Sequence, residues 1–150
     1  MVRSVPGDAE LGMAELYLTH YRSLVRLAAL LVPDPHAAED IVQDSFVAAH
    51  GAWALLPDAD DALCYLRRLV VRRSRSVPAP VMAAAHSAVV AALWKLPSWQ
   101  REILVLRYFA DLPDAQVAAA TGIRPGTVAS QTAEAVHALR AELGSAPPTR

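Results

Sequence analysis

The sequence predicts an all-α protein built from two small helical domains joined by a short linker. Apolar side chains recur at helical spacing along the chain, and no alternation of apolar and polar residues is long enough for a strand. The length of 150 residues and the 54% hydrophobic content suit a folded protein of one or two small domains. The stretch Val77-Pro-Ala-Pro-Val81 breaks the helical pattern, as linkers do. We therefore expect domains at residues 8–77 and 85–144, with the linker at 78–84.

Three helices are expected in the first domain, at about residues 13–31, 35–50 and 62–76. Pro33 stops the first helix, because proline cannot continue one. Asp34 and Pro35 are typical of a helix start, since aspartate caps free backbone amides and proline tolerates the first helical position. From helical spacing, the core-facing residues are expected to be Tyr17, Tyr21, Leu24, Val25, Ala28 and Leu31, then Ala38, Ile41, Val42, Ser45, Phe46 and Ala49, then Tyr65, Leu66, Leu69 and Val70.

Four helices are expected in the second domain, at about residues 82–95, 98–109, 113–120 and 125–143. Ser98 is placed to cap the second of these. The third is short and stops at Thr121-Gly122, and Pro125 opens the longer amphipathic fourth. A short helix, a tight turn and a longer helix form a helix-turn-helix, the motif that places its second helix in the major groove of DNA.

Several function classes are disfavoured by what the sequence lacks. Cys64 is the only cysteine, which excludes an internal disulfide and fits a reducing cytosol. No signal-peptide pattern occurs, and the longest apolar run, residues 27–32, is too short to span a bilayer. The histidines show no metal-ligand spacing, and no glycine-rich phosphate loop is present. We expect a cytoplasmic protein that is not an enzyme, with no metal, cofactor, membrane or small-molecule substrate.

Charge is unevenly distributed, although the net charge is only −1. Between Arg26 and Arg67 there is no lysine or arginine, while five of the fourteen basic residues follow within the next nine positions. An acidic surface followed by a basic one suggests two different partners. The acidic residues are Asp34, Glu39, Asp40, Asp44, Asp58, Asp60 and Asp61, and the basic ones are Arg67, Arg68, Arg72, Arg73 and Arg75.

Asp40, Gln43 and Asp44 stand at positions i, i+3 and i+4, so they share one helix face opposite the predicted core residues. A solvated face of an amphipathic helix is the ordinary explanation of such a pattern. A docking surface for a basic partner helix is the alternative. Catalysis by the paired carboxylates has no support, because no nucleophile or oxyanion donor accompanies them.

Arg68, Arg72 and Arg75 stand at positions i, i+4 and i+7 of the next helix, with Arg67 and Arg73 beside them. A solvated face would also explain this stripe. Guanidinium groups, however, match the geometry of phosphate oxygens. Binding of a nucleic-acid backbone is at least as well supported as the solvated face.

Four motifs then follow one another in order: AEDIVQDSF at residues 38–46, YLRRLVV at 65–71, LPSWQREILVLRY at 96–108 and GIRPGTV at 122–128. The first resembles the AEDLVQEAF motif of sigma-70 family factors of the extracytoplasmic-function type, and the second is similar to the segment that follows it there. The last two look like the LPxxQREVLVLRY and GxSxGTV motifs of the family's C-terminal domain. Together the motifs span most of residues 13–143, which makes the resemblance far more specific than any one of them.

The resemblance implies a promoter-specificity subunit of bacterial RNA polymerase. Asp40, Gln43 and Asp44 would dock on the clamp helices of the polymerase β′ subunit, and the β flap would be a second polymerase contact. The loop near Pro57 to Asp61 and the arginine helix would contact the melted −10 element through Arg67, Arg68, Arg72, Arg73 and Arg75. The last helix and its turn would read the −35 element through Arg124, Thr127, Ser130 and Gln131. An anti-sigma protein is a possible further partner.

The sequence departs from the family pattern in the helix that would read DNA. Ala129 and Glu134 stand where the family carries positive charge, so that helix lacks the electrostatic term that dominates DNA affinity. Pro113 replaces a serine N-cap worth about 1 kcal/mol. Two hypotheses stay open: a sigma factor with weak −35 contacts, or a divergent sigma-like interaction module or regulator that docks on polymerase or another protein but reads promoters weakly or not at all. A plain helix-turn-helix repressor is disfavoured by the match of the first 76 residues.

Overall fold

The computed structural model describes residues 6–56, 58–77 and 87–145, and the regular structure of those residues is entirely helical. The predicted all-α class with two helical domains is therefore confirmed, while the linker predicted at 78–84 lies outside the described residues. The α-helices are α1 (Pro6–Leu31), α2 (Pro35–Gly51), α3 (Ala59–Ser74), α4 (Ala88–Lys95), α5 (Ser98–Leu104), α6 (Asp114–Thr121) and α7 (Val128–Ser145). Between them lie the 3-10 turns η1 (Trp53–Leu55) and η3 (Pro125–Thr127) and the π-helical turn η2 (Val105–Phe109).

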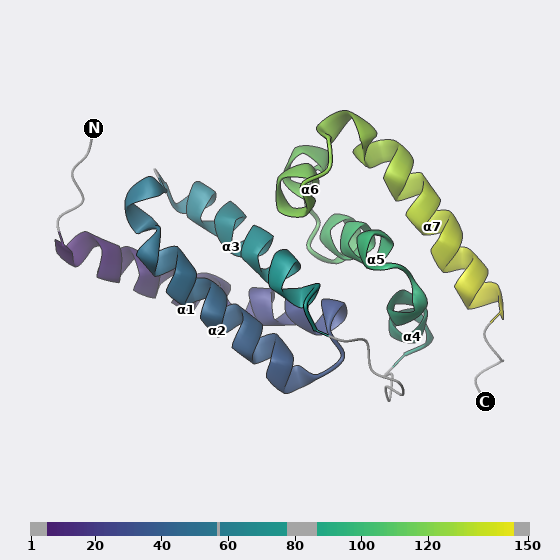
Figure 1. Ribbon diagram of the computed structural model, residues 1–150, viewed down its shortest axis with the longest axis horizontal. Helices are drawn as coiled ribbons and strands as arrows, with labels where there is room; N and C mark the ends of the chain where they lie inside the picture. The colour runs from purple at the N-terminus through teal and green to yellow at the C-terminus, as the bar shows by residue number, and fades with distance from the viewer. Residues whose placement is uncertain (1–5, 57, 78–86, 146–150) are drawn as a thin grey trace.

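The first domain is a bundle in which α1, α2 and α3 pack against one another (Figure 1). The predicted start of α2 is confirmed, because the Asp34 carboxylate accepts a hydrogen bond from the His36 amide at 2.9 Å and Pro35 is the first helical residue. All six residues predicted to line the core side of α2 are buried. In α3, Asp58 caps the Asp61 amide at 2.8 Å, and the helix therefore starts before the predicted residue 62.

The prediction for α1 was wrong in two respects. The helix begins at Pro6 rather than near Met13. The predicted inward face also included Tyr17, whose exposure is 41%, and omitted Leu16 and Leu27, which are buried. The reason is that α1 packs against α2, α3 and the second domain at once, so its buried surface is wider than a single stripe. The Tyr17 ring instead lies across the edge of the core, stacked on Tyr21 with ring centroids 4.6 Å apart.

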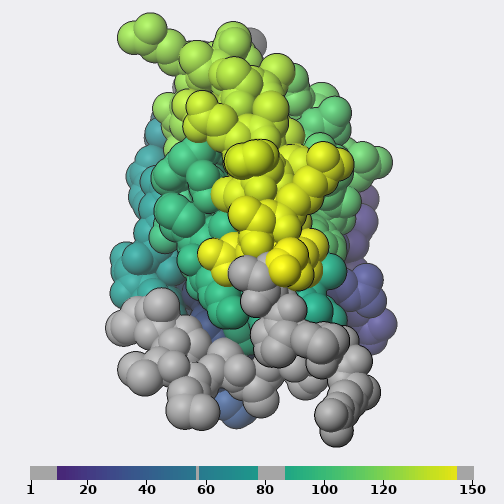
Figure 2. Space-filling model, turned by 90° about the vertical axis from the view of Figure 1, so that its right-hand side faces the viewer, coloured from purple at the N-terminus to yellow at the C-terminus, as the bar shows by residue number. Residues whose placement is uncertain are grey.

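The second domain contains α4 to α7, with α7 laid along its outer surface, where it packs on α4 and α5 (Figure 2). Ser98 is the first residue of α5 rather than its N-cap. The N-cap is Pro97, which makes no capping hydrogen bond through its side chain. The helix predicted at 98–109 changes to a π-helical turn after Leu104. The Ala110 amide then bonds the Val105 carbonyl at 3.0 Å, which exposes Tyr108 and Phe109.

The two domains are packed against each other. Helix α3 of the first domain lies against α6 of the second, and α1 contacts α4, α5 and η2. The buried side chains of both domains form one continuous hydrophobic cluster. The chain is therefore held in a closed arrangement in which α3, the arginine-bearing helix, faces the helix-turn-helix rather than solvent alone.

Gly122 ends α6 in the left-handed region, with φ of +84°, and nothing lies within 4 Å of a Cβ built there. We expect Gly122→Ala to lower the free energy of unfolding by about 1–2 kcal/mol through backbone strain alone. Gly51→Ala is the control, because its site is also open but has no positive φ, and alanine is the better helix former by about 1 kcal/mol. Urea unfolding of both variants tests this; equal stability of the two would contradict it.

Candidate functional site

The acidic face of α2 is fully available for contact. Asp40, Gln43 and Asp44 are exposed, and their helix is fixed in place by the buried residues on its opposite side. Val47, one turn further along the same face, is 73% exposed. Neither Asp40 nor Asp44 forms an ion pair within the described residues, so both carboxylates can meet a partner. The structure thus brings the predicted docking residues together on one rigid, solvent-facing surface.

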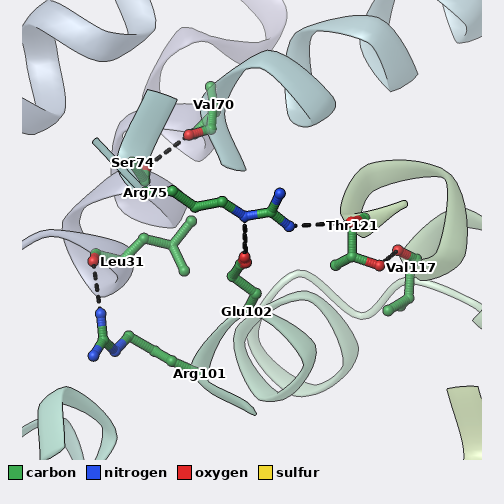
Figure 3. A network of polar contacts seen from close by, with 8 residues as sticks. All are labelled: Leu31, Val70, Ser74, Arg75, Arg101, Glu102, Val117 and Thr121. Atoms are coloured by element: carbon green, nitrogen blue, oxygen red, sulfur yellow. Dashed lines mark hydrogen bonds and ion pairs between the residues drawn. The ribbon is translucent and has the colours of Figure 1, made fainter. Parts of the chain in front are cut away.

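Arg75, at the end of α3, reaches across to the second domain (Figure 3). Its Nε donates to both carboxylate oxygens of Glu102, at 2.6 and 3.1 Å, and its Nη2 donates to the backbone carbonyl of Thr121 at 3.1 Å. The Glu102 side chain is 4% exposed, whereas that of Arg75 is 44% exposed. We call Arg75, Glu102 and the Thr121 carbonyl the interdomain clasp.

Two more of the five arginines face the second domain. Arg67 donates from Nη1 to the Gln116 Oε1 at 3.4 Å, and burial lowers the pKa of its guanidinium. Arg68 is exposed but borders an open groove of about 320 Å³ whose other wall is α6 and the turn after it. Arg72 is exposed on the same helix, and Arg73 is half-buried. The predicted DNA-contacting arginines therefore divide between solvent and the domain interface.

The loop before α3 is negatively charged, whereas the arginine helix that follows is positively charged. Asp58, Asp60 and Asp61 crowd the first turn of α3, where Asp58 serves as the N-cap. Desolvation, followed by the nearby carboxylates of Asp58 and Asp60, raises the pKa of Asp61. Pro57, the first residue of the loop predicted to touch the −10 element, lies outside the described residues. Negative charge at this end of α3 would repel a phosphate backbone.

The helix-turn-helix places its predicted contact residues at the surface, around the start of α7. Arg124, Thr127 and Ser130 are exposed, and Gln131 is half-buried. The two hydroxyls bond within the turn, from Thr127 to the Arg124 carbonyl at 2.8 Å and from Ser130 to the Thr127 carbonyl at 3.0 Å. Ala129 and Glu134 are also exposed on α7. The surface predicted to meet a duplex therefore carries one cation, Arg124, and one acid, Glu134.

Two residues that matter in the structure were missed by sequence reasoning. Glu102 is buried beneath Arg75, and Arg101 beside it binds the carbonyls of Leu93 at 3.0 Å and Leu96 at 2.8 Å. Arg101 also bonds the Trp94 and Leu31 carbonyls, the second of which belongs to the first domain. Both residues lie in the segment Gln100-Arg101-Glu102, where the sequence alone suggests ordinary surface charges. A signal was available in Glu102, a lone acid directly before four apolar residues at 103–106.

The described residues hold no cluster of metal-ligating side chains, and none of their helices is long and apolar enough to cross a membrane. The groove beside Arg68 and a smaller hollow of about 230 Å³ between α1, Arg67 and Phe109 are both lined by mixed polar and apolar residues. Neither contains a nucleophile paired with a base.

Comparison with known proteins connects the two domains to one family. The family model for Sigma-70 region 2 matches residues 16–76, and that for Sigma-70 region 4 matches residues 86–139. The RNA polymerase sigma-E factor of Streptomyces coelicolor is 31% identical over 149 residues, which cover 86% of this chain and 84% of that protein. The chain belongs to the sigma-70 family. It is an RNA polymerase sigma factor of the extracytoplasmic-function (ECF) group, which acts in transcription initiation.

Further relatives agree with this assignment. The ECF RNA polymerase sigma factor SigM of Mycobacterium tuberculosis is 31% identical over 150 residues, covering 87% of this chain and 76% of SigM. Among solved structures, CnrH in complex with the cytosolic domain of CnrY matches with a TM-score of 0.76 and 25% identity, covering 90% of this chain and 89% of CnrH. RpoE of Bartonella quintana, solved with the anti-sigma factor NepR, shares the fold at a TM-score of 0.70 and 21% identity. Sigma factors are initiation factors rather than enzymes.

Proposed function

We propose that this sigma factor docks on core RNA polymerase through Asp40, Gln43 and Asp44 and reads promoters with two DNA-binding surfaces of unequal strength. The exposed acidic face of α2 is the observation that carries the proposal. Its carboxylates form no ion pair within the part of the chain that the structure describes, and they would complement a basic helix. The clamp helices of β′ are the proposed partner of this face. The β flap is the proposed partner of the second domain.

The arginine helix is the stronger proposed DNA surface. Arg67, Arg68, Arg72, Arg73 and Arg75 are proposed to contact the melted −10 element, where their guanidinium groups would hold phosphates. Arg124, Thr127, Ser130 and Gln131 are proposed to contact the −35 element. This second surface carries only one cation among its proposed contact residues. It would therefore position the protein on the duplex while adding little electrostatic affinity for DNA.

We further propose that the chain has no catalytic activity of its own, needs no cofactor and works in the cytoplasm, where polymerase is found. An anti-sigma protein is a proposed regulator, because the solved relatives CnrH and RpoE were each captured with another protein. The proposed residue assignments do not depend on it.

Run-off transcription with purified core polymerase on a library of genomic fragments tests the proposed function. We expect discrete transcripts that depend on this protein. Binding to polymerase without any initiation would instead favour the divergent interaction module, which the depleted charge of α7 makes a specific alternative.

We expect the double substitution Ala129→Lys and Glu134→Arg to strengthen binding to double-stranded DNA. Both positions are exposed on α7, and each new phosphate contact steepens the slope of log K against log salt by about 0.9. A titration of DNA affinity against salt concentration measures the effect. Ala141→Lys is the control for Ala129→Lys, because it is exposed on the same helix but about 18 Å further along it. Equal gains from both lysines would show that the start of α7 is not the DNA-reading end.

A further inference from the structure

The hollow of about 230 Å³ beside α1 combines positive charge with an apolar wall. One face of α1 lines it through residues at positions i, i+3, i+4 and i+7, and α3 and η2 contribute one side chain each. These residues are Ser23, Arg26, Leu27 and Leu30 of α1, Arg67 of α3 and Phe109 of η2. We call this site the α1–η2 hollow.

The two arginines of the α1–η2 hollow have no carboxylate partner. Neither forms an ion pair within the described residues, and no described residue that lines the hollow is acidic. Arg67 is half-buried, and its side-chain hydrogen bond goes to the neutral Gln116 amide at 3.4 Å. Burial lowers the pKa of its guanidinium, and attraction to Cys64 and Asp60 opposes that shift only in part. A guanidinium partly withdrawn from water and left without an anion favours the binding of one.

The Phe109 ring adds a flat apolar surface beside these cations. It lines the hollow and is nevertheless 53% exposed, at the end of the π-helical turn whose extra residue brings it to the surface. Single π-helical turns within helices occur frequently at functional sites. Nucleobases stack on aromatic rings of this kind, and every base has a face that can do so.

We propose that the α1–η2 hollow binds a small phosphorylated aromatic molecule, of which a nucleoside monophosphate is the simplest, with its phosphate on Arg26 and Arg67 and its base against Phe109. The planar fork of a guanidinium matches phosphate oxygens. The hollow is smaller than the about 300 Å³ at which sites for drug-sized ligands begin, which suits a single ring system.

The proposed occupant is a free molecule rather than one nucleotide of a strand. The charge of the hollow is confined to two arginines, whereas a strand requires a positively charged groove that follows its backbone. The inference does not rest on the proposed function, because the hollow shares only Arg67 with the proposed DNA contacts and no residue with the proposed docking face of α2.

Isothermal titration calorimetry of the full chain tests the proposal, with adenosine 5′-monophosphate as the probe. Inorganic phosphate and adenosine are titrated separately. We expect one site per chain, with each fragment bound about tenfold or more weakly than the monophosphate, because each lacks one of the two kinds of contact. Absence of saturable binding would overturn the proposal, and so would equal affinity for the monophosphate and either fragment.

Two matched pairs of variants test the residues. We expect Arg26→Gln to lower the affinity for the monophosphate about tenfold, since a charged hydrogen bond is lost. Arg22→Gln removes the same charge one turn earlier on α1, outside the hollow, and should change the affinity by less than about threefold at 0.15 M salt. Phe109→Ala should weaken binding about fivefold or more, whereas Tyr108→Ala, which removes the neighbouring exposed ring, should not.

All four substituted positions are at least partly exposed, and only two of them line the hollow. Equal losses for Arg26→Gln and Arg22→Gln would show that general surface charge, rather than this site, attracts the probe. Equal losses for Phe109→Ala and Tyr108→Ala would exclude stacking on Phe109. Either result would overturn the proposal.

Methyl NMR of the leucines locates the bound molecule. We expect the monophosphate to shift the signals of Leu27 and Leu30 through the ring current of its base, and to leave those of Leu11 and Leu18 on the same helix unchanged. A mixed-sequence single-stranded DNA oligonucleotide is titrated in parallel. If it shifted the same leucines and bound about tenfold more tightly per site than the monophosphate, the hollow would belong to a DNA path and the free ligand would be refuted.

Discussion

Reversing the charge of Asp40 and Asp44 together, as Asp40→Arg and Asp44→Arg, is expected to weaken association with core RNA polymerase by about 100-fold or more. Both carboxylates lie on the exposed face of α2 proposed to meet the clamp helices. Placing like charges opposite one another at an interface costs several kcal/mol, and each 1.4 kcal/mol is tenfold in affinity. A titration of labelled protein with core polymerase measures the loss.

The matched control reverses two other exposed acids of the same domain, as Glu10→Arg and Glu15→Arg on α1. The change in net charge is identical, but the acidic face of α2 is untouched. We expect this control to bind polymerase within about threefold of the unsubstituted chain, because distant surface charges are screened over about 10 Å at 0.1 M salt. Equal losses in the two double variants would show that net charge, rather than docking at Asp40 and Asp44, controls association.

Replacing Arg101 with methionine is expected to lower the free energy of unfolding by about 2–3 kcal/mol. The guanidinium bonds four backbone carbonyls, three of them at the end of α4, where a helix leaves its last carbonyls without partners. Hydrogen bonds that involve a charged group contribute about 1.5–3 kcal/mol each, reduced here because Arg101 is only half-buried. Burial also lowers the pKa of its guanidinium. In a thermal scan the midpoint should fall by about 5–10 °C.

Arg107→Met is the control for Arg101→Met. Arg107 belongs to the same stretch of chain, but its recorded ion pair, with Asp114, is exposed on both sides. Exposed pairs contribute about 0–1 kcal/mol, so we expect a small change. Arg101→Lys should be intermediate, since an ammonium group keeps the charge and loses the planar fork that reaches several carbonyls. Equal unfolding temperatures for the Arg101→Met and Arg107→Met chains would refute this stabilising role of Arg101.

The sequence was sufficient to predict those features of the fold that depend only on neighbouring residues. The Asp34-Pro35 pair set the start of α2 and apolar spacing set its buried face, because capping and helical periodicity involve only near neighbours. Gly122 likewise marked the end of α6, since a left-handed residue there favours glycine. The four ordered motifs led to the family for a similar reason: each is local.

Features set by contacts between distant segments were not predictable in this way. The buried face of α1 depends on helices from both domains, and the π-helical turn after Leu104 has no local sequence signal. The pairing of Arg75 with Glu102 joins residues 27 positions apart, in different domains. The sequence therefore indicated which residues could bind DNA but not that the second domain covers part of that surface. The residue assignments themselves remain predictions.

Run-off transcription with purified core polymerase tests the central claim most directly, provided that the 5′ ends of the transcripts are sequenced. The account predicts discrete start sites that require this protein, are lost in the Asp40→Arg and Asp44→Arg chain, and persist in the Glu10→Arg and Glu15→Arg chain. The start sites should share an upstream −10 element more strongly than a −35 element, because the arginine helix carries more charge than the start of α7. Tight binding to core polymerase with no protein-dependent start site anywhere in the library would contradict the account.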